Sequence, residues 1–257
     1  MPASVRELEY LTQEQVDQTK FTTGEDNHVG DDYFLNSGDK IRYFLEEDAV
    51  TDGKLNRPKE KAVNKIGHGL HELDPDFRRV TLENETMKAV VRDLQFHRDP
   101  VALQSMVICK QPHIGGEVGE HNDSTFLYTD PPSALGFWIA LEKCTPENGA
   151  LSFLPGSHLT APITKRFVRK PGGGTGFETL IPPEERPRSR RGDTFSRRAS
   201  QSEKNLSPHT RYAYTFHMIE SPPYARYDEK NWLQPTPETP FPHILDKPNP
   251  TTVPIGA

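Results

Sequence analysis

Four short segments rich in aromatic and β-branched residues do most to limit what this chain can fold into. They are ALQSMVICK (102–110), LGFWIALEK (135–143), ALSFLPGSH (150–158) and RYAYTFHMIE (211–220). Each is bounded by Gly, Pro or Asn, as strands commonly are. The 24 prolines and 18 glycines of the chain agree with many turns between such segments. Strands at these turn-punctuated intervals predict a β-sandwich or a jelly-roll barrel.

The first part of the chain predicts less regular structure. Up to about residue 60 it is polar and acidic, and DDYFLNSGDKIRYFLEE (31–47) carries two aromatic clusters separated by a Ser-Gly-Asp turn. We interpret this stretch as a strand or hairpin with loops. From Asp74 the pattern becomes helical, because Asp74 can cap a helix and Pro75 suits its first position. A one-sided apolar stripe follows, made of Met87, Val90, Val91 and Leu94.

Length and composition restrict the class of protein. The 257 residues suffice for one large domain or two small ones, and the net charge of −6 argues mildly against a nucleic-acid surface. No apolar run approaches the roughly 18 residues of a membrane span, so none is expected. The charged first residues do not resemble a secretory signal. Together with two cysteines, Cys109 and Cys144, and no C-terminal peroxisomal address, this predicts a reducing, cytoplasmic location.

His121 and Asp123, within GGEVGEHNDSTFLYTD (115–130), are the first candidate site. Two residues apart on an extended segment, their side chains point the same way. An imidazole nitrogen and a carboxylate oxygen suit a borderline ion such as Fe(II), and a second histidine would complete a facial triad with open coordination positions. A chelating 2-oxo acid and dioxygen would fill those positions. A chance His-x-Asp pair is also expected about once in a chain of this composition.

Arg211 is the second candidate. A 2-oxo acid with a distal carboxylate needs a cationic anchor, and the planar fork of Arg pairs bidentately with carboxylate. Arg211 opens the last predicted strand, and Ala213, Thr215 and His217 share its face, so small residues there would leave room for a ligand. The alternative is an ordinary surface Arg at a strand end.

The stretch RPRSRRGDTFSRRAS (186–200) breaks the strand pattern at a point where a barrel should have a strand. It holds six arginines and no lysine, and Phe195 is its one large apolar residue. Arginines could not enter a barrel wall unpaired without a large desolvation cost. We therefore expect residues 186–200 to form an exposed, poorly ordered loop.

Several motifs recur in an order that resembles the phytanoyl-CoA dioxygenase family of Fe(II)/2-oxoglutarate oxygenases. They include GGEVGEHNDSTFLYTDPP, LGFWIALEKCTPENGALSFLPGSHL and NLSPHTRYAYTFHMIESPP, and the match runs over most of residues 30–243. The resemblance implies one mainly β domain over 1–257, a double-stranded β-helix (jelly roll) with flanking helices, incomplete in this chain. It implies hydroxylation of an unidentified small molecule, with 2-oxoglutarate decarboxylated to succinate. An acyl-CoA substrate is family analogy alone.

The resemblance also assigns residues. It implies that His121 and Asp123 bind iron. It implies that the 2-oxoglutarate site is lined by Lys65, Met106, Trp138, Ser202 and Arg211. From residue type alone, Met106 and Trp138 are equally consistent with a plain core, and Lys65 with a plain surface.

The chain departs from the family at the second iron-binding histidine. Alignment on SEKNLSPHTR (202–211) puts that histidine at position 200, which is Ser. Possible substitutes are His209, which lies in a turn, and His217, which lies well along its strand. The main hypothesis remains an iron-dependent dioxygenase. One alternative is a catalytically inactive 2-oxoglutarate-binding protein, and another is a chain that does not fold stably.

Overall fold

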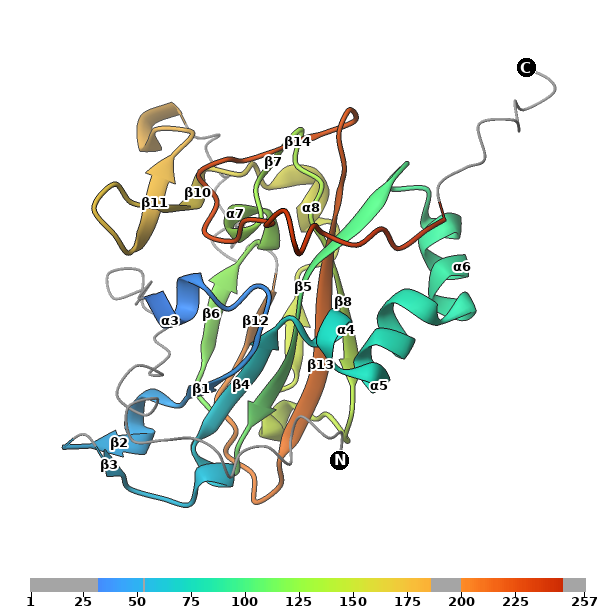
Figure 1. Cartoon of the computed structure of the whole chain (residues 1–257). Helices are drawn as coiled ribbons and strands as arrows, with labels where there is room; N and C mark the ends of the chain where they lie inside the picture. Colours follow the sequence, from blue (N-terminus) through green and yellow to red (C-terminus); the bar gives the residue numbers. More distant parts are fainter. Residues whose placement is uncertain (1–31, 53, 186–199, 247–257) are drawn as a thin grey trace.

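The computed structural model describes residues 32–52, 54–185 and 200–246 of the chain (Figure 1). Its strands are β1 (Ile41–Leu45), β2 (Val50–Thr51), β3 (Lys54–Leu55), β4 (Val63–His68), β5 (Pro100–Lys110), β6 (Val118–His121), β7 (Thr129–Asp130), β8 (Leu135–Ala140), β9 (Leu151–Phe153), β10 (Lys165–Arg169), β11 (Thr175–Thr179), β12 (Ser200–Ser202), β13 (Arg211–Glu220) and β14 (Arg226–Tyr227). Its α-helices are α3 (Asp32–Leu35), α4 (Leu70–Leu73), α5 (Pro75–Arg78), α6 (Glu85–Leu94), α7 (Asp123–Phe126) and α8 (Ser157–Thr160). A π-helical turn covers Arg79–Glu83, and 3-10 turns cover Glu47–Ala49, Lys59–Lys61, Pro146–Asn148 and Pro183–Glu185.

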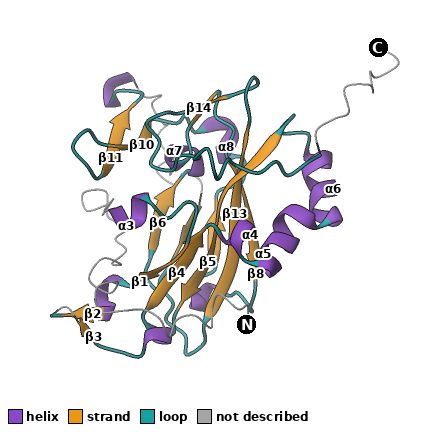
Figure 2. Ribbon diagram, in the orientation of Figure 1, coloured by secondary structure: helices purple, strands orange, loops and turns teal. Residues whose placement is uncertain are grey.

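A five-stranded antiparallel sheet in the order β1-β4-β5-β13-β8, the major sheet, lies at the centre of the described structure (Figure 2). Its two long strands pair from Arg211 opposite Lys110 to Glu220 opposite Pro100. The strand predicted over 211–220 has the bounds of β13, and the one predicted over 102–110 lies within β5. The strand predicted over 135–143 is shorter and ends at Ala140.

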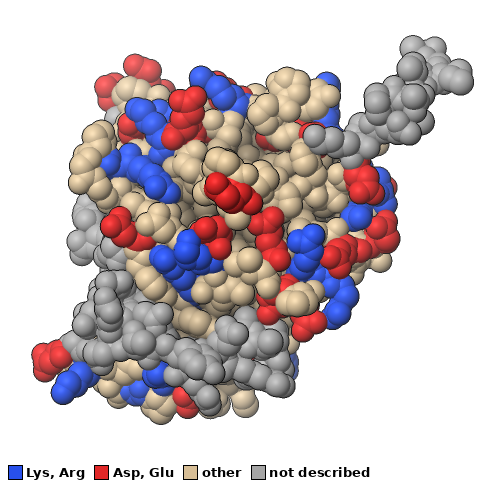
Figure 3. Space-filling view, in the orientation of Figure 1, with Lys and Arg blue, Asp and Glu red and all other residues tan. Residues whose placement is uncertain are grey.

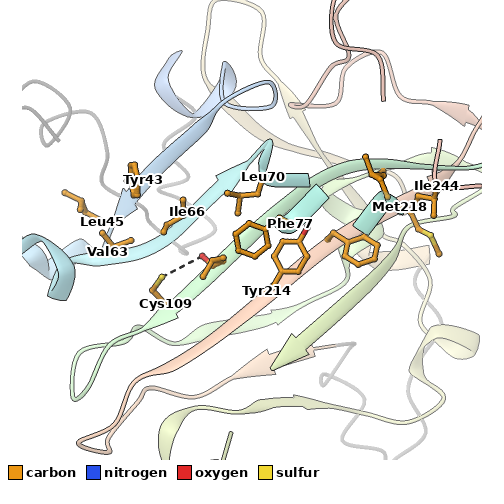
Figure 4. Packing of buried hydrophobic residues seen from close by; sticks show 14 of the residues in the cluster. Tyr43, Leu45, Val63, Ile66, Leu70, Phe77, Cys109, Tyr214, Met218 and Ile244 are labelled. Atoms are coloured by element: carbon orange, nitrogen blue, oxygen red, sulfur yellow. Dashed lines mark hydrogen bonds between the residues drawn. The ribbon is translucent and has the colours of Figure 1, made fainter. Parts of the chain in front are cut away.

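One face of the major sheet, the outer face, packs against helices α4 to α6 (Figure 1). Alternate strand residues such as Val107, Tyr214 and Phe216 point into this core, as period-two alternation requires. The ring of Phe77 from α5 stacks on that of Tyr214, with 4.5 Å between centroids (Figure 4). The Tyr214 hydroxyl lies 2.6 Å from Thr81 Oγ1, which satisfies both buried hydroxyls. The helices thus cover the outer face of the major sheet, and the opposite, inner face remains available for a ligand site.

The helical prediction after residue 74 is confirmed at its start. The Asp74 carboxylate accepts the backbone N–H groups of Asp76 and Phe77, and Pro75 takes the first helical position. The apolar stripe is narrower than predicted. Val91 is buried, but Val90 is 42% and Leu94 51% exposed, because α6 touches the core along one edge.

A smaller antiparallel sheet, β6-β12-β9, is the minor sheet. Residues on the inner face of the major sheet reach toward it: Lys110 Nζ donates to the Ser202 carbonyl at 3.1 Å, and Arg211 Nη2 donates to the Gly149 carbonyl at 2.9 Å. The major sheet thus carries helices on its outer face and meets the minor sheet across its inner face. The predicted fold class, mainly β, a jelly roll with flanking helices, is confirmed.

Three local predictions need correction. The first aromatic cluster of 31–47 forms helix α3 rather than a strand. The strand predicted over 150–158 stops at Phe153, and Gly156, with a φ of +77°, turns the chain into α8. The loop predicted over 186–200 is wrong at its last residue, because Ser200 pairs with both β6 and β9. Residues 186–199 lie outside the described structure.

The surface mixes both signs of charge. On the face in Figure 3, Lys and Arg side chains alternate with Asp and Glu side chains. Across the described ranges, none of the helices combines the length and the apolar character that a membrane span requires.

Candidate functional site

The inner face of the major sheet gathers most of the predicted site residues. Trp138, Thr215 and Met106 are Cα partners across β8, β13 and β5. Partners in adjacent strands share a face, so the alternation that buries Tyr214 on the outer face turns these three inward. Four further residues of the same parity are Lys65, Gln104, Lys110 and Arg211. This face is unusually polar for a sheet interior, which is typical of a ligand site.

His121 and Asp123 converge at the end of β6. His121 is the last residue of the strand and Asp123 the first of α7, with the Asn122 side chain capping that turn through the Ser124 N–H at 2.9 Å. His121 Nε2 lies 3.5 Å from Asp123 Oδ1. His121 Nδ1 lies 2.9 Å from the Gly119 carbonyl, so Nδ1–H donates to that oxygen. The basic lone pair of Nε2 therefore faces Asp123, the arrangement found in metal-binding histidines.

The Asp123 carboxyl is held in its ionised form. Burial opposes this, but the neighbouring imidazoles of His217 and His121 outweigh it, and the pKa of Asp123 falls to about 2. A carboxylate that is ionised at neutral pH and flanked by imidazole nitrogens can bind a cation without first losing a proton.

His217 lies beside Asp123, although its position well along the strand had argued against a place near the iron-ligand candidates. Its Nε2 is 3.5 Å from Asp123 Oδ2, the oxygen that does not face His121. Its Nδ1 is 3.4 Å from Gln104 Nε2 on the neighbouring strand. His209, the other possible substitute ligand, is exposed in the turn before β13.

The pairing of the β12 backbone shows where position 200 lies. Ser200 is the Cα partner of His121, so the residue that the alignment matched to the missing histidine lies across from the first iron-ligand candidate. As the side chains stand, no three His, Cys, Asp or Glu residues in the described ranges form a group able to hold a metal ion.

Arg211 is a buried guanidinium with unused donors. Only 1% of the residue is exposed. Nη2 donates to the Gly149 carbonyl at 2.9 Å, while Nε and Nη1 have no hydrogen-bond partner among the described residues. The guanidinium lies 5.5 Å from the ring centroid of Trp138, and burial lowers the pKa of Arg211. Two unmade hydrogen bonds at a buried cation leave an unmet demand for an acceptor, which an anion could supply. The alternative of a surface Arg is excluded.

Lys110, opposite Arg211, is a residue that sequence reasoning missed. Its Nζ donates to the carbonyls of Ser202 and Glu203, which ties β5 to β12. Burial, and secondarily the charge of Arg211, lower the pKa of Lys110 to about 8. Lys110 lies four residues after Met106 on the same predicted strand and therefore on the same face, so the signal was present in the sequence.

The other predicted residues lie on the same face. Lys65 is 7% exposed, so a plain surface position is excluded, and burial lowers its pKa to about 7. Its Nζ lies 5.0 Å from the ring centroid of Phe44. Ser202 is buried, whereas Met106 and Trp138 are partly exposed rather than packed into the core. The site therefore has a cationic part around Arg211 and a histidine-aspartate part around Asp123.

Comparison with known proteins identifies the family of the chain. The phytanoyl-CoA dioxygenase family model matches residues 5–213. Phytanoyl-CoA dioxygenase domain-containing protein 1 from Bos taurus is 45% identical over 244 residues, which are 88% of this chain and 82% of that protein. Its Caenorhabditis elegans homolog is 43% identical over 238 residues, 87% of this chain and 82% of that protein.

Among solved structures, the chain is similar to EctD from S. alaskensis with 2-oxoglutarate and 5-hydroxyectoine. It has a TM-score of 0.47 and 20% sequence identity, and covers 76% of this chain and 65% of that one. The family model and the curated relatives extend over most of the chain, far beyond the His-x-Asp pair. The chain belongs to the phytanoyl-CoA dioxygenase family.

Proposed function

We propose that this protein is an Fe(II)- and 2-oxoglutarate-dependent dioxygenase that hydroxylates a C–H bond of a small molecule. In the overall reaction, 2-oxoglutarate, dioxygen and the substrate C–H group give succinate, carbon dioxide and the hydroxylated product. The observation that carries the proposal is Arg211, a guanidinium with 1% exposure whose Nε and Nη1 find no partner among the described residues.

The cationic part of the inner face fits the distal carboxylate of 2-oxoglutarate. Arg211 would present Nε and Nη1 as a two-pronged donor, and its third nitrogen is already fixed by Gly149. Trp138 lies beside the guanidinium and would contact the bound 2-oxoglutarate on one side. Lys65 and Lys110 would add positive potential from neighbouring strands, and Met106 and Ser202 would complete the lining.

His121 and Asp123 supply two of the donors that Fe(II) needs. Their nitrogen and oxygen face each other, and the Nδ1–H bond of His121 to Gly119 leaves Nε2 free of its proton. The ion, when bound, would supply activation of dioxygen. The chain's own residues would hold it and orient 2-oxoglutarate beside it. The donor set is one short of the usual triad, because position 200 is Ser.

That missing donor favours a second function, binding of 2-oxoglutarate without turnover. Neither Arg211 nor Lys65 depends on position 200, so the cationic part of the site would remain. A serine hydroxyl is a weak ligand for Fe(II) compared with imidazole. An acyl-CoA substrate for the first function remains an analogy with the family.

One experiment separates the two functions. The purified chain is incubated with Fe(II), ascorbate and 2-oxoglutarate, and succinate is measured, while thermal unfolding is followed with 2-oxoglutarate in the absence of iron. Iron-dependent succinate that disappears in Asp123→Ala supports the dioxygenase. Stabilisation by 2-oxoglutarate without succinate supports the binding protein. If 2-oxoglutarate gives neither effect, both functions are wrong.

A further inference from the structure

His217, Asp123 and Gln104 form a chain of contacts across three elements. Asp123 belongs to α7, His217 to β13 and Gln104 to β5. His217 Nε2 lies 3.5 Å from Asp123 Oδ2, and His217 Nδ1 lies 3.4 Å from Gln104 Nε2. His217 is 8% and Gln104 5% exposed, whereas the Asp123 side chain is 35% exposed. The contact with Gln104 is therefore buried, and the contact with Asp123 lies at the edge of the buried region. Nε2 of the imidazole thus faces a carboxylate oxygen, and Nδ1 faces an amide nitrogen.

The amide of Gln104 determines where the imidazole carries its proton. Its NH₂ group can only donate, so Nδ1 of His217 accepts and the neutral ring holds its hydrogen on Nε2. That hydrogen points to Asp123 Oδ2, which can only accept. In this tautomer Nε2 has no lone pair to offer a metal. His217 is therefore arranged to hold a carboxylate rather than to act as a third ligand.

The two oxygens of Asp123 face different histidines. Oδ1 lies 3.5 Å from His121 Nε2 and Oδ2 3.5 Å from His217 Nε2. A carboxylate held by one oxygen presents the other in a fixed direction, which is how outer partners orient metal-binding groups.

Gly136 on β8 leaves the space that this contact needs. A Cβ built on Gly136 would lie 3.1 Å from Asp123 Oδ2 and 3.1 Å from His217 Nε2, tighter than ordinary carbon contacts. Glycine at this position allows the carboxylate and the imidazole to meet over the strand.

We propose that His217, oriented by Gln104, is a positioning residue that holds Asp123 through Oδ2 and keeps Oδ1 turned toward His121 for metal binding. The inference rests on the proposed function only in taking Asp123 as a metal ligand. It concerns the geometry of the carboxylate and does not depend on turnover of 2-oxoglutarate.

The test measures Co(II) binding by the full chain, using titration and the visible absorption spectrum of the bound ion. His217→Leu should weaken Co(II) binding about 10–100-fold, as loss of an outer partner does. His217→Gln keeps a donor near the place of Nε2 and should recover most of that loss with an unchanged spectrum. Gly136→Ala, which leaves all three polar groups intact, should weaken binding in the same direction. The control is His209→Gln at an exposed histidine, which should bind as the wild type does.

Thermal unfolding without metal is measured for every variant, so that a folding defect in His217→Leu is recognised. If His217→Leu is unfolded, the proposal is tested with His217→Gln and Gly136→Ala instead. Equal affinity in all variants would overturn the proposal. A changed Co(II) spectrum in His217→Gln would overturn it too, because His217 would then be a direct ligand. Failure of the wild-type chain to bind Co(II) would also overturn it. Failure to form succinate with Co(II) binding intact would count against the proposed function alone.

Discussion

Ser200 lies directly opposite His121 in the antiparallel pairing of β12 with β6. Partners at opposite positions of such a pair share a face of the sheet. A histidine at position 200 would therefore start from a backbone site on the same side as His121. At position 200 itself, the departure from the family is thus a changed side chain on a strand position that the described structure retains.

Restoring that side chain should restore metal affinity. In Ser200→His we expect Co(II) affinity to rise at least about tenfold, or about 1.4 kcal/mol, because a third strong donor joins the two present. Affinity is measured by titration and turnover by succinate formation with Fe(II). Ser152→His is the control, since Ser152 pairs with Gln201 in the same sheet, one residue out of register. Equal gains in both variants would refute the assignment of position 200.

We expect Arg211 to lower the stability of the unliganded chain and to be required for binding of 2-oxoglutarate. In Arg211→Met we expect 2-oxoglutarate affinity to fall by about 1.5–3 kcal/mol, because charged hydrogen bonds are lost. Without ligand, the free energy of unfolding should stay unchanged or rise by about 1 kcal/mol, because a buried, incompletely paired cation is removed. Calorimetry and urea unfolding measure the two quantities. Arg226→Met, at an exposed arginine, is the control. Unaltered 2-oxoglutarate affinity in Arg211→Met would contradict the anchor role.

Lys65 should make stability depend on pH. Burial lowers its pKa from 10.5 to about 7, so between these values the unfolded chain binds a proton that the folded chain does not. Stability then rises with pH over this window, and the penalty is fully present below about pH 7. Relative to wild type, Lys65→Met should flatten the slope between pH 7 and 9 by at most about 1.4 kcal/mol per pH unit.

The slope is obtained from urea unfolding at each pH, and the exposed Lys61→Met variant is the control for loss of a lysine. Both variants keep Lys110, so its titration cancels from the comparison. If the free energy of unfolding varies with pH in the same way for wild type and Lys65→Met, Lys65 is charged throughout the range.

Gly149 should tolerate no side chain. Its φ is +75°, and an added Cβ would lie 2.5 Å from the Glu203 carbonyl and 3.0 Å from Lys110 Cδ. We expect Gly149→Ala to lower the free energy of unfolding by more than the roughly 1–2 kcal/mol that the left-handed conformation alone costs. It should also weaken 2-oxoglutarate binding, because the Gly149 carbonyl holds Arg211.

Gly156→Ala separates the cost of the left-handed backbone conformation from the steric clash of an added Cβ. Gly156 has a φ of +77° but nothing within 4 Å of an added Cβ, so only the conformational cost applies. Equal losses of stability in the two variants, with unchanged 2-oxoglutarate binding in both, would show that the contact with Glu203 and Lys110 can relax.

The sequence by itself determined the local structure around the site. Aromatic and β-branched residues identified 211–220 as a strand, and the period of two put Arg211 and His217 on one face. Asp74 with Pro75 identified a helix start. These features depend on neighbouring residues, whose spacing the backbone period fixes. The His-x-Asp pair was recognised in the same way, because two residues of extended chain suffice to bring its side chains together.

The tertiary structure decided which distant residues meet. Contact of Asp123 with His217 joins positions 94 apart in sequence, and the bond from Lys110 to Ser202 joins positions 92 apart. No local period links such positions, because they depend on which strands pair, in which register, and on a bulge after His217. The same long-range pairing drew Ser200 into β12, where charge and polarity alone predicted a loop.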